Sequence, residues 1–482
     1  MQVASKQEVV HSVEKRAYRT VHIIASFLIA GFIGLFSETS LNMALRDLTQ
    51  IFGVQHATIQ WLTTGYLLTL GILVPVSSLL LQWFTTRQLF VVSLIFSIAG
   101  TLIAAIAPGF AVLLIARVVQ AVGTALMLPL MFNTILIIIP PHKRGATMGM
   151  MGLVIMFAPA VGPTLSGLIL QSLSWHWIFW ISLPFLLLSL LFGLAYMQNV
   201  TTPTKPKIDL LSVVLSTLGF GGIVYGFSHA GEGEGGFGNP LVIVSLIVGA
   251  VALLFFVLRQ LRMEQPMLNM RVFTYPMFVV GLLLVLASFM VILSTMIMLP
   301  LYLQTSLALT TFAAGLILLP GGLVNGLLSP VMGRLFDKYG PRWLVIPGLV
   351  IALVTLILFT NLNTQTPAWL IIALHIALMV GISMIMMPAQ TNGLNQLPRE
   401  LYPDGTAIMN TLTQVAGAVG TAVAVSIMAA GQASFLAQSS NPEDPVQLQL
   451  AFTAGVQNAF FFGTAAAVVG LIISFFLKRV KV

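Results

Sequence analysis

Glu38 is the acidic residue of this chain that lies deepest in an apolar stretch, within Leu35-Phe36-Ser37-Glu38-Thr39-Ser40. An ionisable group in hydrocarbon costs roughly 2.5 to 3.5 kcal/mol, so it is tolerated mainly where it faces a cavity or a partner. On a helix, Glu38 shares a small, polar face with Gly31, Gly34 and Asn42. Two interpretations remain open: a buried polar anchor between helices, or a protonatable site on a path through the membrane.

Arg117 is the second group that could do chemistry inside an apolar stretch. On a helix it shares a face with Gln120, Ala121 and Thr124, which sets a permanent cation beside amide and hydroxyl groups. Arginine does not deprotonate in practice, so a cavity must solvate it or an anion must match it. Glu38 is the available intramembrane acid, and we therefore predict a proton-coupling pair of Glu38 and Arg117. The alternative is an arginine that snorkels or packs.

The composition predicts the elements that position these groups. Of 482 residues, 58% are hydrophobic and 7% are charged, against roughly 25% charged in soluble domains. Apolar runs long enough to cross ~30 Å of hydrocarbon recur along the chain, which predicts an all-α integral membrane protein with fourteen spans. The predicted spans are roughly 21–45, 57–81, 87–107, 110–131, 144–170, 175–197, 209–229, 240–260, 277–303, 311–332, 342–361, 366–390, 406–430 and 454–478.

The chain has a net charge of +8, and the placement of its basic residues indicates orientation in a membrane rather than a nucleic-acid-binding surface. With the N-terminus in the cytoplasm, every Lys and Arg falls on the cytoplasmic side except Arg46, outside, and Arg117, within a span. Both termini are then cytoplasmic, and residues 431–453 form the longest outer connection. The chain has no cysteine, no His-Glu-x-x-His and no aspartate pair in a span, so we expect no metal site, no cofactor and no catalytic residues. No ATP-binding glycine loop is present.

Two segments in different halves of the sequence repeat one another. Residues 143–148 lead into the fifth span and resemble residues 404–409, which lead into the thirteenth. Parallel six-span repeats with a site near the bilayer midplane are a transporter architecture. We therefore divide the chain into a cytoplasmic N-terminal segment (1–20), a six-helix bundle (21–200), an inserted helix pair (201–270) and a second six-helix bundle (271–482).

Two segments carry the predicted conformational change. Small residues along the fifth span permit close helix packing, and its prolines bend it; the residues are Pro159, Gly162, Pro163 and Gly167. After the tenth span, Gly333 to Arg342 predicts a latch between two spans, with Asp337 pairing with Arg334 or Arg342 and Gly340 permitting a sharp turn. Polar residues that could line a substrate cavity are Asn42, Tyr66, Gln120, Asn133, Asn325, Gln390, Asn392 and Gln414.

These motifs resemble those of the Major Facilitator Superfamily. Gly333 to Arg342 is similar to its loop signature G-x-L-x-D-x-x-G-x-R, and residues 158–167 resemble the antiporter signature of the fifth span. Trp175 to Pro184 is similar to a run found in fourteen-span drug:proton antiporters, and Phe36-Ser37-Glu38-Thr39 resembles the lincomycin-resistance type of Gram-positive multidrug exporter. The resemblance implies export of amphipathic drugs, such as lincosamide-like antibiotics and dyes, in exchange for protons. It also implies rocker-switch alternating access in a Gram-positive plasma membrane, by a monomer whose partners are its substrates, protons and lipid.

The chain departs from the family pattern at two places. When it is aligned on Asn42 and Ala44, Ser37 rather than Glu38 stands at the acid of the first span. In the connection after the second span, Ser78, Gln82 and Thr85 stand where Gly, Asp and Gly are expected. We therefore expect the charged latch at Asp337. The alternatives are an exporter or uptake symporter of a metabolite or lipid-like molecule, and a membrane receptor or scaffold.

Overall fold

The computed structural model of this chain describes residues 20–41, 44–54, 56–206, 208–232, 236–439 and 441–480. Within these ranges the regular structure is helical, and fourteen helices are long and apolar enough to cross a membrane. The predicted all-α fold with fourteen spans is confirmed. Asn42 and the predicted N-terminal segment, up to residue 19, lie outside the described residues.

The helices follow the predicted spans closely. They are α2 (Thr20–Ser40), α3 (Leu45–Phe52), α4 (His56–Trp83), α5 (Thr86–Ala105), α6 (Phe110–Ile138), α7 (Arg144–Ser172), α8 (Trp177–Tyr196), α9 (Leu210–Glu232), α10 (Pro240–Arg262), α11 (Pro276–Thr305), α12 (Thr311–Tyr339), α13 (Arg342–Phe359), α14 (Ala368–Asn395), α15 (Tyr402–Ala437) and α16 (Pro445–Ser474). Short 3-10 turns lie at Pro141–Lys143 (η2), Gly236–Gly238 (η3), Met270–Thr274 (η4) and Arg399–Leu401 (η5).

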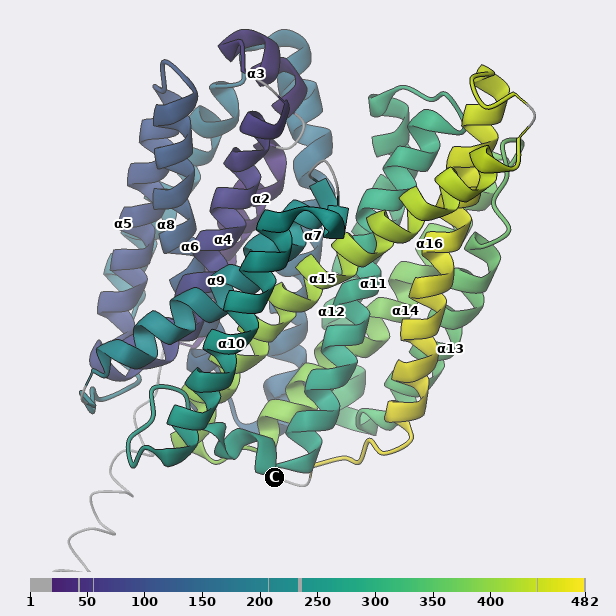
Figure 1. Cartoon of the computed structure of the whole chain (residues 1–482). Helices are drawn as coiled ribbons and strands as arrows, with labels where there is room; N and C mark the ends of the chain where they lie inside the picture. The colour runs from purple at the N-terminus through teal and green to yellow at the C-terminus, as the bar shows by residue number, and fades with distance from the viewer. Residues whose placement is uncertain are drawn as a thin grey trace, which may run out of the picture.

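The helices form two bundles that lean together at one end (Figure 1). One bundle is built from α2 and α4 to α8, and the other from α11 to α16, with α7 packed along α12 between them. The pair α9 and α10 lies across the front, where α9 packs on α4 of the first bundle and α15 of the second. This helix pair therefore bridges the two bundles on one side of the molecule.

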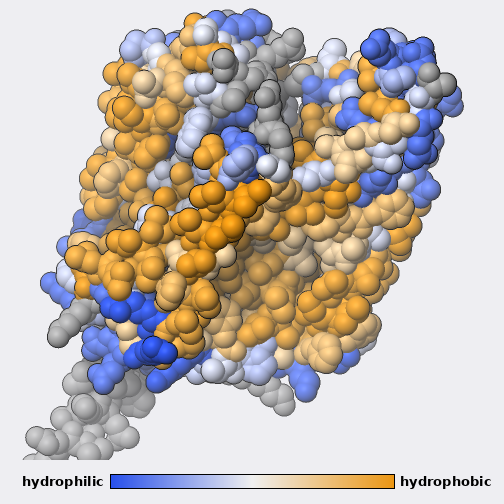
Figure 2. All heavy atoms as spheres, in the orientation of Figure 1, coloured by the Kyte–Doolittle hydropathy of each residue, from blue (hydrophilic) through white to orange (hydrophobic). Residues whose placement is uncertain are grey.

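One end of the molecule holds the connections that follow α4, α6, α12 and α14, at the bottom of Figure 1. Lys143 and Arg399 lie on these connections, and Arg87 and Arg342 lie in the first turns of the helices that follow, so we call this end the basic end. Figure 2 shows hydrophobic side chains along the flanks of the molecule and hydrophilic ones gathered toward its two ends. This belt is the surface that a protein spanning a bilayer presents to lipid.

Two connections differ from the sequence prediction. The expected outer connection over residues 431–453 is wrong, because α15 continues to Ala437 and α16 begins at Pro445. Asp444 caps α16 by accepting a hydrogen bond from the backbone N–H of Val446, and Pro445 suits the first helical position. Likewise α12 runs on to Tyr339, so most of the latch sequence, Gly333 to Tyr339, forms about the last two turns of a helix that stops at Gly340, whose φ is 84°.

Candidate functional site

Arg117 lies on α6, fully buried, where three helices meet. Its Nη1 donates to the backbone oxygen of Ser37 at 2.8 Å and to Oε1 of Gln120 at 3.1 Å. Its Nε donates to the backbone oxygen of Leu62 at 3.3 Å, and its Nη2 to that of Glu38 at 3.3 Å. The planar, forked donor set of arginine thereby joins α2, α4 and α6.

The ring of Tyr66, on α4, covers the Arg117 cation. The guanidinium carbon is 4.2 Å from the ring centroid, a cation–π distance. The Tyr66 hydroxyl donates to Oγ1 of Thr124 at 2.8 Å, and Nε2 of Gln120 donates to Oγ1 of Thr101 at 2.9 Å. Two predicted cavity residues, Tyr66 and Gln120, thus belong to the shell that holds Arg117.

Glu38 lies beside this shell on α2. Its Oε2 atom is buried and has no hydrogen-bond partner. The predicted approach of Arg117 to Glu38 occurs through the Glu38 backbone oxygen, and the two side chains, both among the described residues, do not form an ion pair. The reason is geometric, because Arg117 directs its donors to carbonyl groups of α2 and α4 and to Gln120. A buried carboxyl oxygen without a partner is costly to ionise and suits a group that carries a proton.

The glycine face predicted on α2 lines a small pocket. Gly31 and Gly34 border a space of about 10 Å³ together with Thr124. A methyl group at Gly34 would lie 3.3 Å from Oγ1 of Thr124, the hydroxyl that also receives the Tyr66 hydrogen bond. A space of this size holds about one water molecule. The two glycines of α2 therefore leave a small space beside Thr124 of α6.

The remaining predicted cavity residues do not gather around Arg117. Asn133 is buried on α6 with Oδ1 lacking a partner, and Asn325, on α12, contacts the sulfur of Met379 at 3.3 Å. Asn392 instead holds the C-terminal segment: its Nδ2 donates to the backbone oxygen of Lys478, and its Oδ1 accepts from the backbone N–H of Val480. Gln390 is buried on α14 and Gln414 is half-buried on α15.

The fifth-span helix α7 packs against α12 through residues without bulky side chains. A methyl group at Gly149 or Gly152 would collide with Ser329 of α12, and one at Gly326 of α12 would lie 2.9 Å from Cβ of Phe157. Gly162 faces α2 instead, where a methyl group would lie 2.5 Å from Oγ1 of Thr39. Gly167 has open space around it and Pro159 is half-buried; the side chain of Pro163 lies outside the described residues.

Asp337 joins the two bundles at the basic end. Its Oδ1 accepts from the backbone N–H of Gly145 at 2.8 Å and its Oδ2 from that of Ala146 at 2.9 Å, at the start of α7. A carboxylate at a helix N-terminus is stabilised by free N–H groups and by the helix dipole. The expected arginine partners, Arg334 and Arg342, are exposed, so Asp337 latches a helix end rather than a side chain. Gly333 permits this approach, because a methyl group there would collide with the Gly145 oxygen.

Sequence reasoning missed a buried cation at the same end. Arg144 is only 3% exposed and donates to Oδ1 of Asn395 at 2.8 Å and to the Tyr402 hydroxyl at 3.1 Å, both on the second bundle. It also donates to the backbone oxygens of Leu136 and Ile139, at the C-terminal end of α6. Its place directly before Gly145, in the repeated segment, was the available signal.

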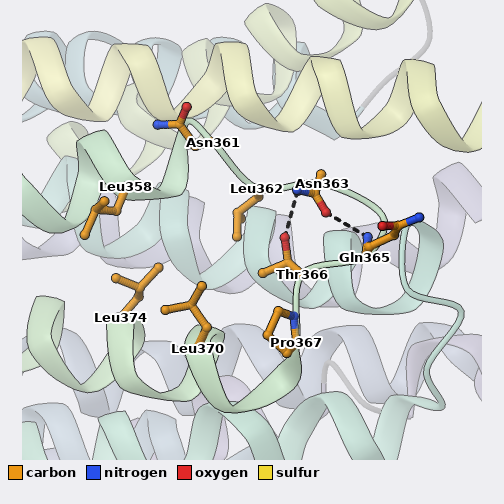
Figure 3. Close-up of a pocket in the computed structure, with 9 residues that line it drawn as sticks. All are labelled: Leu358, Asn361, Leu362, Asn363, Gln365, Thr366, Pro367, Leu370 and Leu374. Atoms are coloured by element: carbon orange, nitrogen blue, oxygen red, sulfur yellow. Dashed lines mark hydrogen bonds between the residues drawn. The ribbon is translucent and has the colours of Figure 1, made fainter.

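A separate pocket of about 370 Å³ lies at the connection between α13 and α14, at the end opposite to the basic end (Figure 3). Thr366 Oγ1 accepts from the backbone N–H of Asn363, and Asn363 Oδ1 accepts from that of Gln365, so the loop holds its own shape. Leucine side chains of α13 and α14 form the other wall. This pocket includes none of the predicted site residues. The described residues also contain no cluster of three His, Asp or Glu side chains that could hold a metal ion.

The comparisons agree with this architecture. The chain is 68% identical to the lincomycin resistance protein LmrB of Bacillus subtilis over 465 residues, 96% of this chain and 97% of the relative. It is 66% identical to the protein of that name in Listeria monocytogenes, over 96% of this chain and 98% of the relative. The human organic anion transporter MFSD10 has a similar fold, with a TM-score of 0.65, 13% identity and coverage of 95% and 99% of the two chains.

The sequence profile of the Major Facilitator Superfamily matches residues 27–421, which run from α2 into α15. The match therefore includes the first bundle, the second bundle as far as the middle of α15, the Arg117 shell and the Asp337 latch. On this match and the near full-length relatives, the chain belongs to the Major Facilitator Superfamily and is a multi-pass membrane transporter rather than an enzyme.

Proposed function

We propose that this protein is a secondary exporter that moves amphipathic drugs and other small organic molecules, lincosamides among them, out of the cell in exchange for protons. Two relatives at 66–68% identity are lincomycin resistance proteins, which supports a drug as the exported substrate. The proton gradient drives the cycle without a cofactor. The protein acts as a monomer in the plasma membrane of a Gram-positive bacterium, with the basic end and both termini in the cytoplasm.

The observation that carries the proposal is the buried Oε2 atom of Glu38, which has no partner although the Arg117 guanidinium reaches the Glu38 backbone. Burial favours the neutral carboxylic acid, and the nearby cation favours the carboxylate. Small changes in hydration then decide whether the proton stays. Glu38 takes up a proton from the outer side, the substrate leaves, and loss of the proton to the inner side resets the site.

The places where the bundles touch support the proposed alternating access. The hydrogen bonds of Asp337 with the α7 N-terminus and of Arg144 with Asn395 cross between bundles at the basic end. The bundles separate toward the opposite end (Figure 1). We assign this arrangement to the state closed toward the cytoplasm. Opening the inner side requires the bundles to rock apart and to break these hydrogen bonds.

The membrane potential is sufficient for useful export. One proton that enters down ~100 mV supplies ~2.3 kcal/mol. A tenfold concentration ratio corresponds to ~1.4 kcal/mol. One proton per substrate can therefore hold the concentration of a neutral substrate roughly 50-fold lower inside the cell than outside, before any pH gradient is added.

The decisive experiment measures efflux of a lincosamide and of a fluorescent amphipathic dye from loaded cells, with and without a protonophore. It compares the wild type with Glu38→Gln and with Asp47→Asn, a matched acid-to-amide change at an exposed residue of α3. We expect efflux to stop with the protonophore and with Glu38→Gln, and to continue with Asp47→Asn. Full proton-coupled efflux by Glu38→Gln would overturn the proton site, and accumulation of substrate in place of efflux would overturn export.

A further inference from the structure

The end of α4 with the connection after it, and the end of α12 with the connection after it, have corresponding residues at the same spacing. We call these two segments the first and the second copy. Each contains a small residue, a polar residue four positions later and an arginine at the end. Gly333, Asp337, Gly340 and Arg342 of the second copy correspond to Ser78, Gln82, Thr85 and Arg87 of the first. The first copy therefore has an amide where the second has its latching acid, and a hydroxyl where the second has a glycine.

In the second copy, the acid lies near the C-terminal end of α12, and its partner is the N-terminal end of another helix. Asp337 accepts from the N–H groups of Gly145 and Ala146, and Gly333 lets the backbone of α7 come close. The equivalent of α7 in the second bundle is α15, which begins with Tyr402 and contains Asp404-Gly405 where α7 has Arg144-Gly145. If the pseudo-symmetry holds, the first connection should meet the start of α15.

The first connection does meet α15, but the acid is on the other partner. Ser78 Oγ, at the end of α4, donates to Oδ1 of Asp404 at 2.7 Å. Both residues are buried, with Ser78 at 0% and Asp404 at 4% exposure. Two of the three departures from the copy after α12 thus coincide in one contact: the acid absent at Gln82 is present at Asp404, and the hydroxyl of Ser78 is its donor. The backbone of Asn269 is a further hydrogen-bond neighbour of Asp404.

The first turn of α15 then holds two helices of the opposite bundle. Tyr402 accepts a hydrogen bond from Arg144 of α7, and Asp404 accepts one from Ser78 of α4. An aspartate in the first turn of a helix is also favoured by the helix dipole. Moving α15 away from the first bundle breaks both contacts together and leaves a buried carboxylate without its donor, which is costly.

We propose that Ser78 and Asp404 form a second clasp of the inner gate, in which Asp404 is a positioning residue that holds the transporter closed at the basic end. In this clasp the acid lies at the start of α15 and the hydrogen-bond donor near the end of α4. In the Asp337 latch the acid lies near the end of α12 and the donors at the start of α7. It rests on alternating access as proposed above, but not on Glu38 as the proton site.

The natural absence of cysteine allows a direct test. Ser329, 1% exposed on α12 and covered by α7 at Gly149 and Gly152, becomes a reporter when it is changed to cysteine, because a thiol there is reached only when the two bundles part. The rate of alkylation by a maleimide is measured on purified Ser329→Cys protein, alone and combined with Ser78→Ala. The matched control is Ser212→Ala, since Ser212 Oγ donates to Asp209 at 2.5 Å within the inserted helix pair and not between the bundles.

We expect Ser78→Ala to raise the alkylation rate about tenfold, the size of effect of one hydrogen bond to a charged group, and Ser212→Ala to leave it unchanged. Asp404→Asn, which keeps an acceptor oxygen, should raise the rate less than Asp404→Ala. Ser78→Ala combined with Asp404→Ala should add little to Asp404→Ala alone. An unchanged rate for Ser78→Ala, or an equal rise for Ser212→Ala, would overturn the clasp. The same ratios of alkylation rates are measured in a Glu38→Gln background. Because the clasp does not depend on Glu38 as the proton site, these ratios test the clasp even if Glu38 proves not to carry the proton.

Discussion

Arg117 donates to the backbone oxygen of Ser37 at 2.8 Å, so the buried cation is bound to the helix that carries Glu38 and not to the Glu38 carboxylate. With the chain aligned on Asn42 and Ala44, Ser37 stands where the family pattern has the acid of the first span. The Ser37 backbone oxygen accepts a hydrogen bond from Arg117, while the Oε2 atom of Glu38 has no hydrogen-bond partner.

Arg117→Lys should lose both stability and transport. Lysine keeps the charge but has no planar fork, so it cannot reach the backbone oxygens of Ser37 and Leu62 and the amide of Gln120 together. Each lost hydrogen bond to a charged donor costs about 1.5 to 3 kcal/mol. The unfolding temperature in detergent and the efflux rate measure the two effects. A lysine variant as stable and active as the wild type would show that the donor geometry is unimportant.

Tyr66→Phe and Tyr66→Leu separate the two roles of this side chain. Phenylalanine keeps the ring over Arg117 and loses the hydrogen bond to Thr124, at a cost of about 1 kcal/mol. Leucine also loses the cation–π contact, which is worth about 2 kcal/mol when desolvated. We expect the unfolding temperature to fall in the order wild type, Phe, Leu. Equal values for the two variants would exclude a contribution from the ring.

Gly333→Ala should open the seam between the bundles. Its methyl group would collide with the backbone oxygen of Gly145, so α12 must move away from α7 and from the Asp337 contact. Gly315→Ala is the matched control on the same helix, because nothing lies within 4 Å of its added methyl group. For Gly315→Ala we expect the free energy of unfolding to rise by up to about 1 kcal/mol, because alanine has a higher helix propensity than glycine. Thermal unfolding of the two variants tests the contrast, and a stabilised Gly333→Ala would contradict the close approach.

The ion pair at the base of the inserted pair should contribute to stability independently of pH in the neutral range. Arg259 donates to Asp209 from Nε at 2.6 Å and from Nη2 at 2.9 Å, and these bonds hold the pKa of Asp209 well below its ordinary value of 3.8. Because the folded-state pKa is depressed, the stabilisation is complete above the unfolded value and is lost only as the pH falls below it.

Asp209→Asn should therefore lower the unfolding temperature by the same amount at pH 5 and at pH 8. The difference from the wild type should shrink only in strong acid. A difference that changed between pH 5 and pH 8 would contradict the depressed pKa.

The sequence alone determined the class of this protein. Spans are set by local composition, because hydrocarbon accepts about twenty apolar residues in a helix wherever they occur. The fourteen spans, the positions of Glu38 and Arg117 within spans and the family could therefore be predicted from order and spacing. The extensions of α12 and α15 beyond the predicted spans could not be predicted in this way. Hydropathy marks the part of a helix that lies in hydrocarbon, and polar residues can continue the helix beyond it.

Only the tertiary structure decided which groups meet. The sequence placed Glu38 in the first span and Arg117 in the fourth. That Arg117 donates to backbone oxygens depends on how α2, α4 and α6 are rotated against one another. The same is true of Asp337, whose partner is a helix end 191 and 192 positions away, and of Ser78 with Asp404, 326 positions apart. Such contacts are fixed by the packing of the two bundles, which is a property of three-dimensional shape and leaves no periodic signal along the chain.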